Sequence, residues 1–326
     1  MSTQLLPFGK KGWDYGRVPD LVGRHYAITG GNSGIGYETA KMLIRRNAHV
    51  TIFCRSEDRA KKAVDELAEF RSVKAKIEFE IMDLADLNSV RAAADRFVGW
   101  HEKLDGLINN AGIMMVPERI ETRDGFELHM GANHFGHFLF SSLLFDLIKK
   151  ANGRVVTVSS VAHRWGLEQI NFDDLQLQHS YAPMAAYGQS KLANIMFILE
   201  LNRRLMALDM PSCGYLCHPG YAATNLQRTG PSFLTRIGLE VMNVIFAHSP
   251  FHGAKSQVLA ATDPEAQPGL FYGPTKMRGL SGPVGVTPIS HSAGNQEAAA
   301  RLWDVSEELT GAKWDLPPVP RVPDDA

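Results

Sequence analysis

The sequence predicts an α/β fold, with a single doubly wound parallel sheet of about seven strands and helices on both faces. Two observations support this prediction. Short runs of β-branched and other apolar residues alternate along the chain with long segments of helical periodicity. The apolar runs show no polar alternation, which is typical of strands buried on both faces of a parallel sheet. Helical crossovers between such strands indicate consecutive β-α-β units.

The expected elements follow one another along the chain. The apolar runs predict strands at residues 24–29, 49–54, 76–82, 105–109, 154–159 and 212–217. Helical patterns cover residues 34–46, 57–71, 88–100 and 184–205, and a further long helix ends near Lys150. The helix that starts at residue 57 opens with Glu57 and Asp58, two acids that the helix dipole favours in a first turn.

One domain accounts for most of the chain, because no linker-like change of composition interrupts residues 21–312. An N-terminal arm, residues 1–20, precedes it, and a Pro-rich tail, residues 313–326, is expected to be extended or disordered. Hydrophobic residues form 44% and charged residues 21% of the chain, which excludes an intrinsically disordered protein.

Charge and cysteine content exclude further classes. The 34 Lys and Arg residues balance 35 Asp and Glu residues, which argues against nucleic-acid binding because that requires clustered basic side chains. Three cysteines cannot form a disulfide framework, so we expect a reducing compartment and a cytoplasmic protein. No apolar stretch reaches the roughly 18 residues that span a bilayer. We therefore expect no transmembrane segment, although peripheral membrane contact stays possible.

A glycine-rich turn follows the first expected strand. The segment Thr29-Gly-Gly-Asn-Ser-Gly-Ile-Gly36 leads directly into a helix. Glycines keep such a turn tight and let a pyrophosphate approach the free N–H groups at the helix start. No Lys-Ser or Lys-Thr pair follows the last glycine, which excludes a P-loop. The turn therefore predicts a dinucleotide site whose residues include Gly30, Asn32, Ser33, Gly34, Ile35 and Gly36.

Four further motifs agree in order and spacing with one known family. They are Asn109-Asn110-Ala111-Gly112 with the later Asn133, then Ser160, then Tyr187-x-x-x-Lys191, and finally Pro219-Gly220. Together with the turn spacing Thr-Gly-x-x-x-Gly-x-Gly, they resemble the short-chain dehydrogenase/reductase family, whose fold is of the Rossmann type. The segments 124–138, 159–163 and 187–194 resemble its branch of retinol-dehydrogenase-like and WW-domain-oxidoreductase-like proteins.

Tyr187 and Lys191 are the candidate catalytic pair. They lie four residues apart in a helical pattern and so project from one face, where the ammonium is expected to lower the pKa of the phenol. The resemblance implies that Tyr187 is the general acid/base, that Lys191 also holds the cofactor ribose, and that Asn133 belongs to a proton relay. Ser160 is the expected carbonyl-polarising hydroxyl. Ser159 is the alternative, because neighbouring side chains on an extended segment point in opposite directions.

The residue after the second strand decides the cofactor. An acid there would bind the ribose hydroxyls of NAD, whereas Arg would accept the 2′-phosphate of NADP. Arg55 follows the strand directly, while Glu57 and Asp58 fit a helix start, so we predict NADP(H). The resemblance adds residues that contact the cofactor: Asp83, Leu84, Asn110, Ala111, Gly112, Tyr187, Lys191, Pro219, Gly220 and Thr224. Asp83 could otherwise cap a helix, and Asn110 could simply tie adjacent strands.

The segment 231–249 is rich in apolar residues and follows the last expected strand. It predicts a small helical lid, about residues 221–250, over a lipophilic ketone or aldehyde and its alcohol. Core packing, an oligomer surface and membrane contact are the alternatives. The function expected is NADP(H)-dependent oxidoreduction, and a catalytically silent NADP-binding regulatory protein is the other hypothesis. The resemblance also implies a possible homodimer or homotetramer, formed through the helices before and after the fifth strand.

The sequence predicts no catalytic or metal-binding role for the histidines. His134 and His137 are three residues apart on a helix but have no third ligand of suitable spacing nearby, so no metal site is predicted. His163 and His218 lie beside the expected active site and are candidates for a substrate contact. Cys213 and Cys217 lie too far apart along a strand for a disulfide, and we expect small buried side chains.

Overall fold

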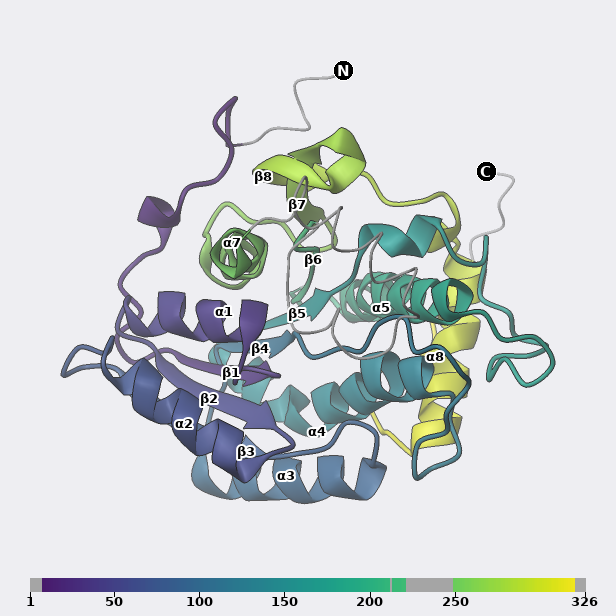
Figure 1. The fold of residues 1–326 in the computed structure, drawn as a ribbon, viewed down its shortest axis with the longest axis horizontal. Helices are drawn as coiled ribbons and strands as arrows, with labels where there is room; N and C mark the ends of the chain where they lie inside the picture. The colour runs from purple at the N-terminus through teal and green to yellow at the C-terminus, as the bar shows by residue number, and fades with distance from the viewer. Residues whose placement is uncertain (1–7, 212, 221–248, 320–326) are drawn as a thin grey trace.

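The computed structural model describes residues 8–211, 213–220 and 249–319 (Figure 1). In this part of the chain, eight strands form one sheet in the order β3-β2-β1-β4-β5-β6-β7-β8. The strands are β1 (His25–Thr29), β2 (His49–Cys54), β3 (Lys76–Ile81), β4 (Gly106–Asn109), β5 (Arg154–Val158), β6 (Gly214–Cys217), β7 (Phe271–Lys276) and β8 (Ser281–Thr287). All pairings are parallel except that of β7 with β8. The predicted doubly wound α/β fold is confirmed, with one antiparallel edge strand more than expected.

Helices cover both faces of the sheet (Figure 1). On one face lie α1 (Gly34–Ile44), α2 (Glu57–Ala68) and α7 (Pro250–Thr262). On the other lie α3 (Leu87–Trp100), α4 (Gly136–Ala151) and α5 (Pro183–Met206), and α8 (Gln296–Thr310) packs on α4 and α5 from outside.

The sheet separates two hydrophobic cores, and alternate strand residues enter each. Ala27 and Phe53 face the core of α3, α4 and α5, whereas Tyr26, Ile28 and Ile52 face the core of α1 and α7. Because both faces are buried, each strand needs apolar residues at every position, which explains the continuous apolar runs of the sequence.

The ends of two elements differ from the sequence-based bounds in ways that affect the site. β5 ends at Val158, so Ser159 and Ser160 both lie beyond the strand. Ser160 then caps a short 3-10 turn, Val161–Arg164, by accepting the N–H of Ala162. α5 begins one residue earlier than expected with Pro183 at its first position, where a missing N–H costs nothing.

Both described termini are packed against the domain. In the N-terminal arm, Trp13 is buried, and its indole donates to Asp263 at 2.7 Å. Arg17 forms an ion pair with the same carboxylate at 2.7 Å. In the tail, Trp314 and Leu316 are buried in the core beside α5 and α8, although the segment is irregular. The expectation of an extended or disordered tail did not anticipate this packing.

The expected lid falls almost wholly outside the described residues. Residues 221–248 are not described, and Thr224 is among them. Ser249 and Pro250, at the end of the expected lid, form the N-terminus of α7.

Among the described helices, none is both long and apolar enough to cross a membrane.

Candidate active site

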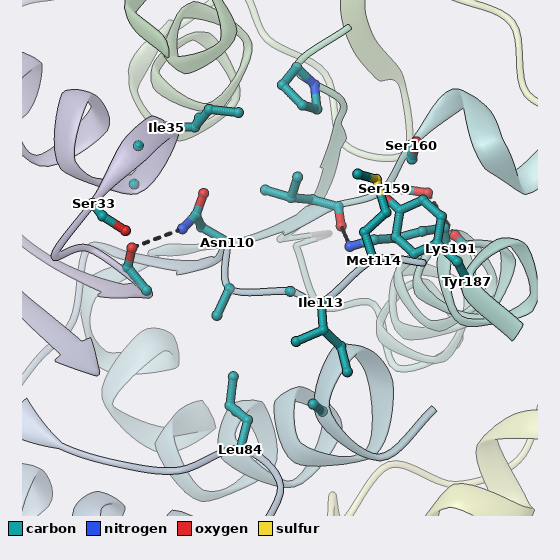
Figure 2. A pocket seen from close by; sticks show the side chains of 18 of the residues that line it. Ser33, Ile35, Leu84, Asn110, Ile113, Met114, Ser159, Ser160, Tyr187 and Lys191 are labelled. Carbon is teal, nitrogen blue, oxygen red and sulfur yellow. Dashed lines mark hydrogen bonds between the residues drawn. The ribbon is translucent and has the colours of Figure 1, made fainter. Parts of the chain in front are cut away.

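A cavity of about 550 Å³ opens at the carboxyl ends of the parallel strands. This is the edge where doubly wound sheets bind ligands. Figure 2 shows Ser33 and Ile35 at one end of the cavity and Tyr187 and Lys191 at the other. The sequence-predicted residues that line it are Gly30, Asn32, Ser33, Gly34, Ile35, Gly36, Arg55, Asp83, Leu84, Asn110, Ala111, Gly112, Ser160, Tyr187, Lys191, Pro219 and Gly220.

The turn between β1 and α1 requires glycine at two positions. Gly34 opens α1 with a φ of +57°, in the left-handed region that favours glycine. A Cβ at Gly36 would lie 2.5 Å from both the Asn110 amide nitrogen and the Gly30 carbonyl oxygen. Ser33 precedes the helix without a side-chain capping hydrogen bond. The first N–H groups of α1 thus meet the cavity, an arrangement that fits a dinucleotide pyrophosphate.

Asn110 holds this turn against β4. Its amide nitrogen donates to the Thr29 carbonyl at 2.7 Å, and its oxygen accepts from Gln257 at 2.8 Å. Thr29 Oγ1 in turn accepts the N–H groups of Asn110 and Ala111 at 3.0 and 2.9 Å. Asn110 therefore ties adjacent strands together, which the sequence analysis gave as the alternative to a cofactor contact. It also lines the cavity (Figure 2).

Tyr187 and Lys191 project from one face of α5 into the buried end of the cavity (Figure 2). The Lys191 ammonium lies 5.8 Å from the centre of the Tyr187 ring and donates to the Val158 carbonyl at 3.1 Å. Both side chains are buried, at 8% and 4% exposure. A phenol, an amine and the Ser160 hydroxyl are thus held in one water-poor pocket.

Burial dominates the acid–base properties of this pair. It lowers the pKa of Lys191 to about 8. Burial also raises the pKa of Tyr187 above its ordinary value, and the hydrogen bond from Ser160 offsets this only in part. The expected lowering of this pKa by Lys191 is therefore not seen in the protein alone, where burial is the largest cause and Ser160 is the one that opposes it. Tyr187 is protonated near neutral pH, the form that can donate a proton.

The two candidate serines have different partners. Ser159 donates to the Lys191 carbonyl oxygen at 2.6 Å and is 1% exposed, so its hydroxyl fixes β5 to α5. Ser160 is less buried, and its hydroxyl is close enough to the Tyr187 phenol to lower the pKa of that group. These contacts favour Ser160 as the hydroxyl that meets a ligand beside Tyr187.

Asn133 lies behind the cavity rather than in its lining. It sits in a π-helical turn, Met130–Phe135, that leads into α4. Its oxygen accepts from the Ile113 N–H at 2.8 Å, and its nitrogen donates to the Ile113 carbonyl and to Ser190 at 3.0 and 2.9 Å. A Cβ at Gly112 would lie 3.3 Å from both Asn133 Oδ1 and Lys191 Nζ. Asn133 is thus close to Lys191, and hydrogen bonds to the Ile113 backbone hold its side-chain amide in place.

Two arginines line the cavity at the end of β2. Arg55 follows the strand as expected, and Arg59, one helical turn into α2, was not singled out in the sequence. Both are exposed. Glu57 instead pairs with Lys61 at 2.7 Å on the solvent side of α2. The acids at this helix start are therefore not directed at the cavity, and the local charge that meets a ligand is positive.

Asp83 does not cap α3. Of the two roles that the sequence allowed for it, a cofactor contact or a helix cap, the helix cap is therefore wrong. The cap is Asp86, which accepts the N–H groups of Asn88 and Ser89. Asp83 accepts the Ala85 N–H at 3.0 Å in a tight turn, and its residue still lines the cavity.

The histidines near the site are structural. His163 bonds to the Ser160 carbonyl and accepts the Ser290 N–H, while His218 bonds to Thr287. Both are 1% exposed and neither lines the cavity, so the expected substrate contact is not supported. His134 and His137 are buried too, and burial lowers the pKa of each to about 3.

The remaining lining is largely apolar and was missed in the sequence. Its larger apolar members include Ile113, Met114, Met115, Leu128, Trp165, Met184 and Leu280. Their signal was weak, because these residues come from separate loops and helices that only the fold brings together. They form the apolar wall of the cavity, and Figure 2 shows one of them, Met114, beside Tyr187.

Fold and cavity together define a dinucleotide-binding protein of the doubly wound α/β class. Residues 24–231 match the family model for short chain dehydrogenase. Retinol dehydrogenase 12 of Mus musculus is 38% identical over 90% of this chain and 89% of its own length. Polyprenol dehydrogenase of Homo sapiens is 37% identical over 95% of this chain and 92% of its own.

Solved structures agree. A protein from Mycobacterium paratuberculosis superposes with a TM-score of 0.74 at 36% identity, covering 94% of this chain and all of its own. The Pseudomonas aeruginosa RhlG/NADP active-site complex shares the fold, with a TM-score of 0.59 at 21% identity over 77% of this chain and 94% of its own. The chain belongs to the short-chain dehydrogenase family and is retinol-dehydrogenase-like. It is an oxidoreductase of a family that uses a nicotinamide cofactor.

Proposed function

We propose that this protein is an NADP(H)-dependent oxidoreductase that interconverts a lipophilic ketone or aldehyde and its alcohol. The observation that carries the proposal is the convergence of Ser160, Tyr187 and Lys191 at one end of a cavity whose other end is the open start of α1. A phosphate-binding helix start and a proton donor in one cavity suit a hydride-transfer enzyme.

The residues have separate tasks in carbonyl reduction. Tyr187, protonated because burial raises its pKa, donates its proton to the oxygen of the substrate carbonyl. Ser160 donates a hydrogen bond to the same oxygen and stabilises its developing charge. Lys191 provides a buried ammonium that favours the resulting phenolate. When bound, the cofactor supplies or accepts the hydride.

Asn133 acts behind Lys191 in this proposal. Its amide fixes the backbone at Ile113, which holds the wall of the cavity opposite α5. This contact positions the wall of the reaction pocket and matches the relay position that the family resemblance implies.

The preference for NADP(H) follows from charge. Arg55 and Arg59 both line the cavity beyond β2, and Glu57 is paired with Lys61 on the outside of α2. A 2′-phosphate at this place would meet two guanidinium groups, the side chains best suited to bind phosphate. Asp83 is the only carboxylate among the described cavity residues, and it follows β3 rather than β2, so no acid stands at the end of β2 where the ribose hydroxyls of NAD would be bound.

The substrate class follows from the apolar wall. Met114, Met115, Trp165 and Met184 line the same cavity as Tyr187, and Met is a flexible residue that adapts to bulky apolar ligands. The relatives named retinol and polyprenol dehydrogenase support the same class. The alternative of a catalytically silent NADP-binding regulatory protein would not need a buried proton donor beside the nucleotide.

A cytoplasmic location is part of the proposal, as are possible homo-oligomers. The expected interface through α4 and α5 is restricted, because α8 and Trp314 pack over α5, which is buried along most of its length. We therefore propose that any homodimer or homotetramer uses a different surface.

A panel of carbonyls and alcohols with each cofactor tests the function. We expect turnover of long-chain or cyclic apolar carbonyls with NADPH, and much lower catalytic efficiency with NADH. Best efficiency on small polar carbonyls would contradict the substrate class. Equal efficiency with both cofactors would contradict the cofactor assignment, and NADPH binding without turnover of any substrate would favour the regulatory alternative.

A further inference from the structure

Three histidines and a glutamate gather at the amino ends of the strands, opposite the cavity. His25 opens β1, His49 opens β2, Glu78 lies within β3, and His101 directly follows α3. One nitrogen or oxygen atom from each lies within 4.8 Å of the others. No contact of the catalytic site involves this group, which we call the His3Glu cluster.

The sheet register explains why these side chains meet. His25 is paired with His49 across β1 and β2, and Thr51 is paired with Glu78 across β2 and β3. Residues two apart on a strand share a face, so His25, His49 and Glu78 all project to one side. α3 covers that side, with Phe97 beside His25 at 5.3 Å between ring centres. His101 closes the group as the C-cap of α3.

The distances between the four groups are those of metal ligands. The Glu78 Oε1 atom lies 3.0 Å from His49 Nε2, 3.1 Å from His101 Nε2 and 3.9 Å from His25 Nε2. Ligands of a tetrahedral zinc ion, bound at 2.0–2.1 Å, are about 3.4 Å apart. The cluster is therefore close to the size of a four-ligand zinc shell. The His25 and His49 rings stack in parallel with their centres 3.9 Å apart, so at least one of them must rotate for both nitrogens to point at one ion.

The hydrogen bonds within the His3Glu cluster do not satisfy every nitrogen atom of its histidines. His49 Nε2 is buried and lies 3.0 Å from Glu78 Oε1, but within the described residues it makes no well-directed hydrogen bond. A buried nitrogen without a well-directed hydrogen bond is available to bind another ligand, such as a metal ion. His25 Nε2 bonds to Thr51 Oγ1 at 2.8 Å, and that hydroxyl donates to Glu78 at 2.7 Å. A metal would replace the first of these bonds, and Thr51 would continue to orient the Glu78 carboxylate.

We propose that His25, His49, Glu78 and His101 form a zinc site. Three imidazoles and one carboxylate suit Zn²⁺ or a similar transition ion and not Mg²⁺ or Ca²⁺, which prefer oxygen ligands. The Glu78 side chain is 42% exposed, which gives an ion access from solvent.

Four protein ligands leave no open position, as is typical of a structural zinc site. The ion would join β1, β2, β3 and the end of α3, elements that Figure 1 shows side by side. The proposal concerns stability, and it is independent of the cofactor and the catalytic residues.

Zinc titration of the tag-free, chelator-treated protein tests the site. We expect one equivalent of Zn²⁺ to bind in calorimetry and to raise the melting temperature, because an ion that binds only the folded state stabilises it. Co²⁺ in the same site should give the intense visible absorption of a tetrahedral nitrogen and oxygen shell. Absence of stoichiometric binding, or only weak octahedral Co²⁺ absorption, would overturn the proposal.

Variants of the cluster residues test whether the zinc ion binds at the His3Glu cluster. His101→Ala, at a partly exposed helix end, should weaken Zn²⁺ binding at least tenfold and abolish the zinc-dependent rise in melting temperature. His179→Ala removes an exposed histidine outside the cluster and should change neither. Glu78→Gln keeps the shape of the cluster and should also weaken binding, so it decides the question if His101→Ala does not fold. Unchanged affinity in the cluster variants would show that zinc binds elsewhere and would contradict the site.

Discussion

Lys191 illustrates at the scale of one residue how a functional group lowers stability. Its ammonium is buried beneath the cavity with the Val158 carbonyl as hydrogen-bond acceptor, and burial lowers its pKa to about 8 from an ordinary 10.5. Below pH 8 the folded protein must hold a charge that water would solvate better. This penalty is of the order of 3 kcal/mol, and it decreases from pH 8 to 10.5, because the unfolded chain then binds more protons than the folded one.

Lys191→Met should therefore stabilise the cofactor-free protein. We expect a gain of about 2 kcal/mol near pH 7, after about 1 kcal/mol is subtracted for the lost hydrogen bond. The gain should shrink between pH 8 and 10.5, where wild-type Lys191 becomes neutral in the folded state. Urea unfolding of both proteins at pH 7 and pH 10 measures it, and a difference that does not change with pH would refute the burial penalty.

A second prediction at the scale of single residues concerns Arg55 and Arg59. Each lines the cavity beyond β2, so Arg55→Ala or Arg59→Ala should weaken NADPH binding about tenfold, the loss of one charge-assisted contact to phosphate. NADH binding should change little. Lys62→Ala removes an exposed charge of α2 that does not line the cavity and serves as the matched control. Fluorescence titrations measure all three, and an equal loss for both cofactors would argue against a 2′-phosphate contact.

At the scale of elements, α5 contains a buried ion pair whose arginine also contacts α8 and the C-terminal segment. The Glu200 side chain is fully buried and accepts from Arg204 at 2.7 Å, while Arg204 also reaches Asp304 on α8 and the Leu316 carbonyl. This pairing holds the C-terminal segment against α5, whose own outer face would otherwise be exposed.

Glu200→Gln should destabilise the fold by about 3–5 kcal/mol, since it leaves the buried Arg204 charge without its main partner. Asp304→Asn is the matched control, because the Asp304 side chain is 64% exposed and such pairs contribute less than about 1 kcal/mol. Thermal or urea unfolding compares the two variants. Similar losses in both would mean that the buried pair is no more important than the exposed one.

The sequence predicted elements best where one local pattern was enough. The continuous apolar runs located β1 to β6 within a residue or two, and the glycine spacing located the phosphate turn. The β7–β8 hairpin could not be placed, because Gly273, Pro274, Gly282 and Pro283 interrupt its strands. Pro283 is tolerated since β8 is an edge strand, and Pro274 lies in β7 beyond Phe271 and Tyr272, the residues that pair with β6.

Site residues that belong to one sequence motif could be predicted. Site residues that only the fold brings together could not. Arg59, Met114 and Trp165 join the cavity from separate segments, so no spacing revealed them. The same holds for the His3Glu cluster, whose members stand more than 20 residues apart and meet only through strand register. The pKa of Tyr187 also escaped prediction, because it depends on burial rather than on Lys191.

At the scale of the whole molecule, the sheet divides the protein into two functional edges. The carboxyl ends of the strands hold the cavity with Tyr187, and the amino ends hold the His3Glu cluster. The described parts of both termini pack onto this body, with Trp13 on one side and Trp314 on the other. The chain between them forms one continuous sheet, so cofactor and substrate would meet within a single cavity.

Tyr187→Phe tests the central claim most directly, because it removes only the phenolic oxygen. NADPH affinity and turnover of an apolar carbonyl should be measured on the same preparation, with wild type and Ser159→Ala as references. We predict that Tyr187→Phe binds NADPH with unchanged affinity and loses at least 99% of turnover, consistent with the roughly 10²–10⁴-fold contribution of a positioned proton donor. Near-normal turnover in Tyr187→Phe would contradict the proposed mechanism.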